Sequence, residues 1–441
     1  MTSSTIYIET YGCTANQNNS EIIAGTLKQA GYQITNNLDL AEIIILNTCI
    51  VKQKTITKIK RRIQDIAQTG KLMIISGCMP ETHIKELEKL KKTGKLFFLG
   101  THHFKDINKL LNTINSNQLT KKKQLEFLEP QNEEKLLLPK ISRNKLISII
   151  QISEGCLGNC TYCLTKFAKG KLFSYPEEKI LKQIESDLNQ GAKEIWITSQ
   201  DNASYGLDKN TGSQLPALLN KILDLKHNFK IRLGMMNPNT FLPILDKMIE
   251  IYKDKKMYNF LHLPIQSASN NVLKSMNREY NLEQAEKILS RFKKEFPNIT
   301  LATDIIIGYP TETEQEYKKN IEFITKFSPS VLNLAKFSRH KTTKASTLNP
   351  LPIKTIKQRT IQLMNLHRET AKQNKEHFLD KEVEVFVNNK KQGIYESRDE
   401  NYNIILINTK EKILGKRLKV KIIEIGVHHM IGTLLLSKLL K

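Results

Sequence analysis

The sequence predicts an α/β protein in three parts: an N-terminal parallel-sheet α/β domain, a central partial (βα)6 barrel and a C-terminal small antiparallel β-barrel. Short apolar runs alternate with amphipathic segments over residues 1–115, six candidate strands alternate with helices over 146–340, and runs of period two fill 381–441. A polar segment at 116–145 is predicted to be a linker, and residues 341–380 a helical connector. At 441 residues, the chain is long enough for each part to bury its own core.

The composition limits the class of the protein and its partners. Lys and Arg number 68 against 44 Asp and Glu, a formal net charge of +24, so a polyanion such as nucleic acid is the expected partner. A compositional bias that leaves the lysines merely solvated is the alternative. No apolar run approaches the ~20 residues of a membrane helix, and no signal-peptide pattern opens the chain. Six cysteines in so long a chain do not form a disulfide scaffold, so we expect a reducing cytoplasm.

Three predicted strands of the N-terminal domain each lead into a cysteine. The strands cover residues 5–9, 42–46 and 72–75, and the cysteines that follow are Cys13, Cys49 and Cys78. Because parallel strands end at the same edge of a sheet, these cysteines should converge where α/β folds bind ligands. We interpret them as the three protein ligands of a 4Fe–4S cluster with one open iron. Three scattered buried cysteines are the alternative.

The barrel is predicted to begin with a strand at 146–152 that leads into Cys156, Cys160 and Cys163. Three thiolates in so short a loop can hold a 4Fe–4S cube and leave its fourth iron free for a non-protein ligand. Electron-transfer clusters use four cysteines and zinc sites pair two short cysteine couples, so neither fits this spacing well. A small structural zinc site or three buried apolar cysteines are the alternatives.

Polar side chains follow or end the remaining barrel strands. Those strands are predicted at residues 194–198, 230–235, 258–263, 300–307 and 331–337. The loops after the strands are where βα barrels carry their chemistry. The polar residues that stand out there are Gln200, Asp201, Asn237, Gln266, Arg278 and Asp304.

Alternating apolar and polar residues predict the C-terminal barrel. The runs cover residues 382–387, 402–407 and 417–423, after a helix from 353 to about 378. Basic residues crowd around the last run against a single acid, Glu411, as a phosphate-tracking groove would require. These basic residues are Lys410, Lys412, Lys416, Arg417, Lys419 and Lys421. A solvated strand face is the alternative. We interpret His428 and His429 as surface or core histidines rather than metal ligands.

Several motifs resemble those of known enzymes. The cysteine loop, with Tyr162 before its last cysteine, resembles the signature of the radical S-adenosylmethionine enzymes. The segments around the first three cysteines resemble the N-terminal domain of the methylthiotransferases. Thr165-Lys166, after the loop, is similar to the archaeal and eukaryotic branch that modifies threonylcarbamoyladenosine in tRNA. The C-terminal barrel resembles the TRAM domain of RNA-modifying enzymes.

The resemblance implies two 4Fe–4S clusters and S-adenosyl-L-methionine as cofactors. The barrel cysteines would hold the cluster that cleaves S-adenosylmethionine, whereas the N-terminal cysteines would hold the cluster that presents sulfur or a methylthio group. The resemblance also implies five cofactor-binding residues: Tyr162, Gln200, Asp201, Gln266 and Arg278. Asp304 is a weaker candidate, because an Asp at a strand end also suits the cap of the next helix.

The predicted activity is the insertion of sulfur and a methyl group at C2 of threonylcarbamoyladenosine beside the anticodon. The partners would be tRNA, an electron donor and a sulfur donor, and no membrane. The sequence departs from the family pattern in two places, of which the first should matter little and the second bears on substrate specificity. Ala268 stands where the family often has Gly, and Arg339-His340-Lys341 replaces a usual Pro-Arg-Pro-Gly turn.

Other functions remain open on the sequence alone. Within the family, the substrate could instead be isopentenyladenosine in tRNA or an aspartate of a ribosomal protein. A different class would be a non-catalytic iron–sulfur RNA-binding redox sensor. The polar residues at the barrel mouth argue against a sensor, because a sensor needs no cofactor pocket.

Overall fold

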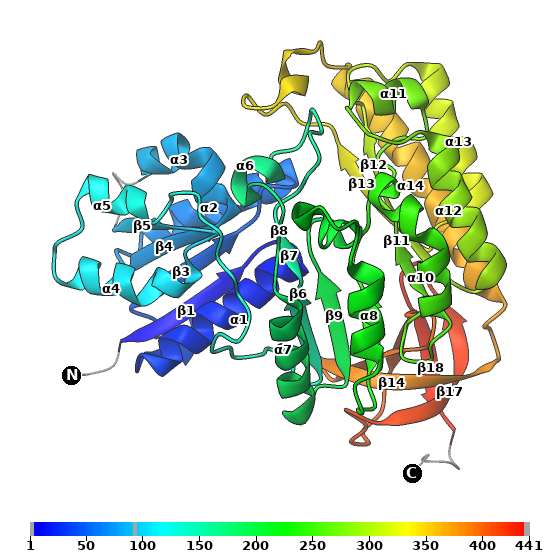
Figure 1. The fold of residues 1–441 in the computed structure, drawn as a ribbon, viewed down its shortest axis with the longest axis horizontal. Helices are drawn as coiled ribbons and strands as arrows, with labels where there is room; N and C mark the ends of the chain where they lie inside the picture. The colour runs from blue at the N-terminus through cyan, green and yellow to red at the C-terminus, as the bar shows by residue number, and fades with distance from the viewer. Residues whose placement is uncertain (1–3, 91–94, 436–441) are drawn as a thin grey trace.

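The computed structural model of the protein describes residues 4–90 and 95–435, and it has the predicted mixed α/β architecture in three parts (Figure 1). The N-terminal domain, blue to cyan, lies beside the central part, and the red C-terminal barrel packs below it (Figure 1). Within the described residues, no helix is long and apolar enough to cross a membrane.

The N-terminal domain is a five-stranded parallel sheet in the order β2-β1-β3-β4-β5. Its central strand β3 is buried at every position, as expected for a parallel sheet covered on both faces. The three strands that lead into cysteines, β1, β3 and β4, are neighbours. The strands are β1 (Thr5–Thr10), β2 (Gln33–Thr35), β3 (Ile43–Thr48), β4 (Leu72–Gly77) and β5 (Leu96–Gly100). The helices are α1 (Thr14–Gln29), α2 (Gln53–Ala67), α3 (Cys78–Leu90) and α4 (Ile107–Asn115).

The segment at 116–145, predicted to be a linker, is packed against the domains on either side. It contains helix α5 (Lys121–Glu126), where the side-chain amide of Gln124 bonds both backbone groups of Phe98 on β5. Leu136 joins the core of the central part. The polar composition of the segment does not reveal that Gln124 and Leu136 pack against the two neighbouring domains.

The central part has six parallel strands in two sheets of three, β10-β9-β6 and β11-β12-β13. A parallel bridge between Ile231 of β10 and Met257, just before β11, joins them into the predicted partial barrel. The strands are β6 (Ile147–Gln151), β9 (Glu194–Thr198), β10 (Lys230–Leu233), β11 (Phe260–His262), β12 (Thr300–Ile307) and β13 (Val331–Lys336). The helices are α7 (Glu177–Asn189), α8 (Leu215–Leu223), α9 (Pro238–Phe241), α10 (Leu245–Tyr252), α11 (Asn270–Ser275), α12 (Leu282–Glu295) and α13 (Glu314–Phe327).

A short hairpin closes the base of the cysteine loop. Strand β7 (Ser153–Glu154) pairs with β8 (Phe173–Ser174). Between them, the chain carries the three barrel cysteines and helix α6 (Thr165–Lys169). Helix α6 packs against α3, so the cysteine loop of the barrel touches the N-terminal domain (Figure 1).

The C-terminal barrel is closed, in the order β14-β15-β16-β18-β17, and follows helix α14 (Ile353–Glu376). The predicted runs correspond to β14, β16 and β17, whereas β15 and β18 were not predicted. The strands pair antiparallel as expected, except that β16 and β18 are parallel and complete the closure. The strands are β14 (Glu382–Lys391), β15 (Ile394–Arg398), β16 (Ile404–Ile407), β17 (Arg417–Ile425) and β18 (Met430–Leu434).

This small barrel packs against the beginnings of the central strands. The side chain of Asn388 on β14 donates to Oε1 of Glu194, the first residue of β9, at 2.9 Å. The ring of Tyr402 packs on Tyr258 and Trp196, with centroids 4.9 and 6.3 Å apart. The cysteine loop follows the other end of β6, so the C-terminal barrel and the cysteine loop lie at opposite ends of the central strands (Figure 1).

Candidate functional site

The N-terminal triad, Cys13, Cys49 and Cys78, gathers at the ends of neighbouring strands. Cys13 precedes α1, Cys49 directly follows β3, and Cys78 is the first residue of α3. The pKa of Cys78 is raised to about 12, mainly by burial and in part by the thiols of Cys49 and Cys13, because neighbouring thiolates repel each other. The three thiols are therefore close enough to interact.

Buried amide side chains tie these strand ends together. Asn16 donates through Nδ2 to the carbonyls of Tyr11 (2.8 Å) and Thr48 (2.9 Å). Asn47 donates to the carbonyl of Asn16 at 2.8 Å, and the hydroxyl of Thr48 donates to the carbonyl of Ser76 at 2.6 Å. No individual role was predicted for Asn16 and Asn47 from the sequence. The feature that could have indicated one is that each asparagine stands within three residues of a cysteine.

Two glycines with left-handed backbone allow the strand ends to approach. Gly12 has φ +115°, and a Cβ there would stand 2.6 Å from Cβ of Cys49. Gly77 has φ +82°, and a Cβ there would stand 2.4 Å from Oδ1 of Asn47. Any larger side chain would push the cysteine-bearing loops apart.

The barrel triad, Cys156, Cys160 and Cys163, lines one small loop. A Cβ built on Gly158 would lie 3.5 Å from Sγ of Cys156 and 3.7 Å from Sγ of Cys160, so both sulfurs border the same space. The backbone N–H of Gly158 donates to Sγ of Cys156 at 3.3 Å. The pKa of Cys156 is raised to about 11, mainly by burial and in part by Asp201, Cys160 and Cys163.

The backbone closes this loop at its base. The N–H of Cys156 donates to the carbonyl of Gly170 at 3.3 Å. Gly155 has φ +79°, and a Cβ there would lie 1.9 Å from the carbonyl oxygen of Lys171. The entering and leaving segments therefore touch, which only glycine at position 155 permits.

Among the predicted cofactor residues, Arg278 and Tyr162 lie near the barrel triad. Arg278 donates through Nη1 to Sγ of Cys160 at 2.9 Å and through Nη2 to Oδ1 of Asn237 at 2.6 Å. Its buried Nε has no partner among the described residues. The ring of Tyr162 packs edge-on against Tyr309, with centroids 6.4 Å apart. A guanidinium with an unused N–H can still bind an anionic ligand.

The other predicted cofactor residues differ in how their polar groups are used. The carboxylate of Asp201 is buried and accepts from the N–H of Asn237 at 3.0 Å and the hydroxyl of Thr240 at 2.7 Å. The buried Oε1 of Gln200 has no partner in the described part of the chain. Gln266 has φ +64° and is held by backbone bonds to β12. A non-glycine residue in this conformation is typical of functional sites.

Asp304 pairs with a histidine that the sequence analysis did not single out. Nε2 of His262, the last residue of β11, lies 2.6 Å from Oδ2 of Asp304 on β12. The helix-cap alternative for Asp304 is wrong, because Asp304 lies inside β12 and the following helix, α13, is capped by Thr313. A lone histidine in an apolar run gave no signal, since its partner lies on the next strand.

Helix α6 connects the two triads. It begins two residues after Cys163, and Leu164 and Ala168 pack in the same apolar cluster as Cys49 and Cys78. A single short helix thus follows the barrel triad directly and touches the N-terminal triad.

The chemistry of the two triads fits iron–sulfur cubes. All six cysteines are free thiols, and three thiolates can hold a 4Fe–4S cube with one iron left open. Each triad therefore supplies three ligands to a cube.

The basic residues of the C-terminal barrel have more acidic neighbours than the sequence suggested. The six predicted residues, Lys410, Lys412, Lys416, Arg417, Lys419 and Lys421, are exposed or half-buried. Strand β14 places Glu384 opposite Lys419 and Glu382 opposite Lys421. Asp380 forms a further ion pair with Lys421 at 2.9 Å. The sequence showed only Glu411 among these basic residues. The other acids were not recognised as neighbours, because they lie on strand β14 or just before it.

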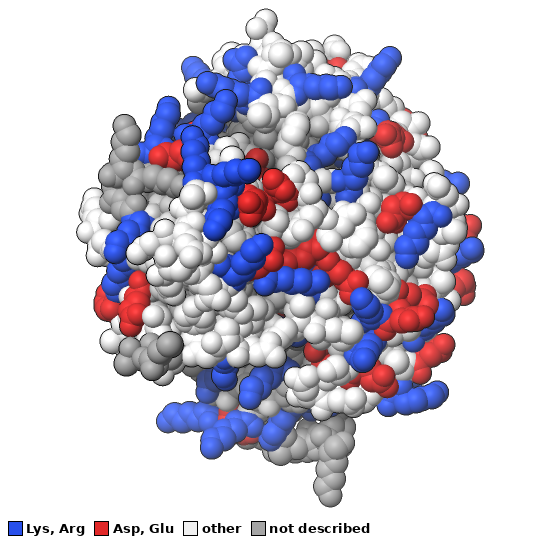
Figure 2. Space-filling model, turned by 60° about the vertical axis from the view of Figure 1, so that its left-hand side comes forward, with Lys and Arg blue, Asp and Glu red and all other residues white. Residues whose placement is uncertain are grey.

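Helix α2 offers a second basic surface, beside the N-terminal triad. Its buried side consists of Ile56, Ile59, Ile63 and Ile66. Exposed basic residues on α2 and just before it, here called the α2 basic face, are Lys52, Lys54, Lys58 and Arg61. None of them forms an ion pair within the described residues, although the exposed side of the helix also carries Asp65. Their neighbours Lys60 and Arg62 pair with Glu86 and Glu9. Figure 2 shows Lys and Arg gathered over the upper part of one face, with acidic side chains concentrated toward the centre and right.

Comparisons with known proteins agree with this geometry. Residues 5–99 match the uncharacterized protein family UPF0004, and residues 150–324 match the Radical SAM superfamily. Among solved structures, the chain resembles the radical S-adenosylmethionine methyltransferase TsrM from Kitasatospora setae. The TM-score is 0.57 at 12% identity, over 78% of this chain and 75% of that chain. At this identity the likeness shows the fold.

Curated relatives match along almost the whole chain. A probable threonylcarbamoyladenosine tRNA methylthiotransferase of Pyrococcus abyssi is 36% identical over 91% of this chain and 93% of its own length. The Homo sapiens threonylcarbamoyladenosine tRNA methylthiotransferase is 32% identical over 97% of this chain and 73% of its own length. The cofactors of such enzymes are S-adenosyl-L-methionine and 4Fe–4S clusters, and the chain has a Radical SAM domain. The chain belongs to the radical S-adenosylmethionine tRNA methylthiotransferases, in the threonylcarbamoyladenosine family.

Proposed function

We propose that the chain converts N6-threonylcarbamoyladenosine, beside the anticodon of tRNA, to its 2-methylthio derivative. Two cysteine triads joined by α6 carry this proposal, in a chain that aligns over 91% and 97% of its own length with two relatives named for that substrate. The C2–H bond of adenine is aromatic and strong, so neither a base nor a nucleophile activates it readily. A site that brings radical chemistry and a sulfur source to one base meets this requirement.

The barrel triad is assigned to the cluster that binds S-adenosylmethionine. When bound, the two groups together supply the radical chemistry. Arg278 would hold a cluster-ligating sulfur through Nη1, as it holds Cys160 here, and would offer its unpartnered Nε to the methionine carboxylate. Gln200 would accept from the ammonium or a ribose hydroxyl through its unpartnered Oε1.

Three further residues would shape this pocket. Tyr162, backed by Tyr309, would lie beside the adenine ring, and Gln266 would contribute its amide. Asp201 would act through other residues, because both its oxygens are engaged. Asp201 holds the backbone of Asn237, whose side chain in turn accepts from Arg278.

The N-terminal triad is assigned to the second cluster, which would hold the sulfur or methylthio group. The buried asparagine network and the two glycines would fix the position of this cluster relative to α6. The reaction needs an electron donor and a sulfur donor from outside the chain. Six free thiols must stay reduced, so the cytoplasm is the compartment we propose.

The tRNA would contact the α2 basic face first. These cations lie beside the triad and have no acidic partners among the described residues, so they remain free for phosphates. The basic residues of the C-terminal barrel would contribute less, because Glu382, Glu384 and Asp380 neutralise part of them. They also lie at the far end of the central strands from the cysteine loop.

The test is mass spectrometry of tRNA nucleosides from a host that lacks the modification, with and without the chain expressed. The proposal predicts a new methylthio-threonylcarbamoyladenosine peak, which disappears in the Cys156→Ala variant. A methylthio gain on isopentenyladenosine would replace the proposed substrate with that nucleoside. If protein holding both clusters modifies no nucleoside, the proposal fails, and the ribosomal-protein aspartate is tested next.

A further inference from the structure

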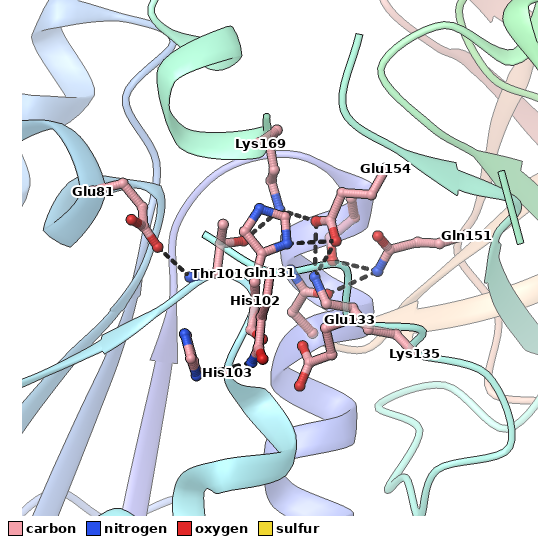
Figure 3. Close-up of polar contacts among 12 residues, drawn as sticks. Glu81, Thr101, His102, His103, Gln131, Glu133, Lys135, Gln151, Glu154 and Lys169 are labelled. Atoms are coloured by element: carbon pink, nitrogen blue, oxygen red, sulfur yellow. Dashed lines mark hydrogen bonds and ion pairs between the residues drawn. The ribbon is translucent and has the colours of Figure 1, made fainter. Parts of the chain in front are cut away.

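A buried ionic cluster lies where the cysteine loop meets the N-terminal domain (Figure 3). Glu154 lies between two ammonium groups: Nζ of Lys135 contacts its two oxygens at 2.8 and 2.7 Å, and Nζ of Lys169 contacts Oε1 at 2.5 Å. Lys169 also donates to the hydroxyl of Thr101 at 2.5 Å. The side chains of Lys135, Glu154 and Lys169 are 0, 2 and 2% exposed.

The cluster joins three separate parts of the chain. Glu154 lies two residues before Cys156, Lys169 ends helix α6, and Thr101 follows strand β5 of the N-terminal domain. Lys135 comes from the segment between the two domains. The base of the cysteine loop is thus bonded directly to the N-terminal domain.

This ionic cluster has an excess of positive charge near Lys169. Two ammonium groups share the single carboxylate of Glu154, and a buried charge is costly unless it is compensated. Glu133 lies on the Lys135 side, where its charge opposes the lowering of the pKa of Lys135 by burial. On the other side is Glu81, bonded to the N–H of Thr101. Burial raises the pKa of Glu81 to about 7, so it is only partly ionised near neutral pH.

His102 does not restore the balance, because it could add only positive charge. Its Nδ1 lies 3.5 Å from Oε2 of Glu154. Lys169 bonds Thr101, which directly follows Gly100 of β5. Gly100 is paired with Gly77 of β4, and Cys78 directly follows Gly77, so the bonded ammonium lies at the strand ends that carry the triad. Ala168, the residue before Lys169, packs in the apolar cluster that contains both cysteines. The uncompensated ammonium therefore borders the N-terminal triad.

We propose that Lys169 is a positioning residue for the N-terminal triad, whose ammonium compensates the negative charge of the bound cluster and raises its reduction potential. The proposal rests on the assignment of the second 4Fe–4S cluster to this triad. A cube with three thiolates is anionic and becomes more so on reduction. A fixed cation in a medium of low dielectric constant stabilises the reduced state more than the oxidised state.

The buried ionic cluster around Glu154 also explains why the ammonium group of Lys169 stays in place. A lysine side chain alone would turn toward water, because the interior does not solvate ammonium. Glu154 and Thr101 hold Lys169 at the boundary between the two domains. Lys135 completes the bonding of Glu154, but its Nζ lies over the ring of Phe104, 4.7 Å from the centroid, whereas Lys169 bonds Thr101 at the strand ends. This difference makes Lys135 a matched control for Lys169.

The experiment uses the full chain with the barrel triad replaced by alanine, so that only the N-terminal cluster is loaded. The variants are Lys169→Met, Lys169→Arg and Lys135→Met. Each is reconstituted without oxygen, assayed for iron and sulfide, and titrated with dithionite under electron paramagnetic resonance. Lys169→Met should shift the midpoint potential to a more negative value. Lys169→Arg should restore it, and Lys135→Met should leave it unchanged although it breaks the other buried ion pair of Glu154.

Equal shifts for Lys169→Met and Lys135→Met would overturn the proposal, as would no rescue by Lys169→Arg. If Lys169→Met takes up no iron, iron content itself decides: retained iron in Lys135→Met and Lys169→Arg supports the proposal, and equal loss in all three contradicts it. The titration contains no tRNA, so a wrong substrate assignment would not alter its result. A parent protein that binds no iron at its N-terminal triad would refute the cluster assignment itself.

Discussion

The two cysteine triads are built in opposite ways. The barrel triad lies within one loop, and the contact between Gly155 and Lys171 closes that loop. The N-terminal triad is assembled from three strand ends far apart in sequence, held by Asn16 and Asn47. The first depends on local chain geometry and the second on the topology of a whole sheet. A similar set of ligands can therefore fail for different reasons in the two places.

The largest expected effect is that loss of a cysteine from each triad abolishes a different activity. Cys156→Ala should abolish release of 5'-deoxyadenosine from S-adenosylmethionine, because it removes a ligand of the cleaving cluster. Cys49→Ala should retain this release and lose only methylthio transfer. Chromatography of 5'-deoxyadenosine, with iron content measured on the same samples, checks both outcomes. If Cys49→Ala loses all iron and all cleavage, the two triads do not work separately.

The next largest effect distinguishes the two triads by the glycines that shape the backbone around each of them. Gly77→Ala should destabilise the N-terminal domain by about 2–4 kcal/mol, because its Cβ would overlap the backbone of Thr48 in a left-handed conformation. Gly155→Ala should do the same to the cysteine loop. Iron uptake should fall in the N-terminal triad for the first and in the barrel triad for the second. Denaturant unfolding and iron content measure the two effects.

Two glycines provide matched controls for backbone strain alone. Gly70 and Gly191 also have positive φ, at +69° and +105°, but a Cβ on either meets nothing within 4 Å. Gly70→Ala and Gly191→Ala should cost only about 1–2 kcal/mol and leave iron uptake unchanged. Iron loss as large as in Gly77→Ala would show that close approach is not what the glycines provide.

A pH effect should arise outside both triads. Burial lowers the pKa of His367, on α14, to about 4, so the folded protein holds this ring neutral while the unfolded chain titrates near its ordinary value of 6.5. The unfolded state therefore binds more protons between these values, and stability falls as pH drops from 6.5 toward 4. Between pH 7.5 and pH 5 the loss should be about 2 kcal/mol.

The His367→Gln variant supplies the comparison for this effect. Its thermal stability should lose less on acidification than that of the parent protein, whatever its stability at neutral pH. Identical pH profiles for the two proteins would mean that another group governs the acid response.

The smallest effect concerns the two basic surfaces. Replacing Lys54, Lys58 and Arg61 by glutamine should weaken tRNA binding about tenfold and reduce the salt slope by about one for each phosphate that is no longer neutralised. Replacing Lys416, Arg417 and Lys419 should have a weaker effect, because Glu384 lies opposite Lys419. Fluorescence anisotropy at several salt concentrations measures both. A larger effect of the second set would restore the C-terminal barrel as the principal RNA surface.

The sequence predicted features that depend on periodicity and on strand direction. Strand β9 and strand β12 begin and end where expected, and all three cysteines of the N-terminal triad follow adjacent parallel strands. These features follow from residues near one another or from a general rule of parallel sheets.

The sequence did not reveal pairings between distant elements. Glu154 meets Lys135 and Lys169 only after the hairpin β7–β8 and the packed segment 116–145 are in place. His262 acquires a partner from the next strand. No local pattern encodes such pairings, because each depends on which surfaces the finished fold brings together.

The bridge formed by α6 limits how far this enzyme can be divided into modules. Removing the N-terminal domain would leave Leu164 and Ala168 without the apolar side chains that cover them, and would leave Lys169 without Thr101. A central domain without the N-terminal domain would thus expose an apolar surface beside the ammonium of Lys169 and the carboxylate of Glu154. The smallest autonomous catalyst should therefore include both domains.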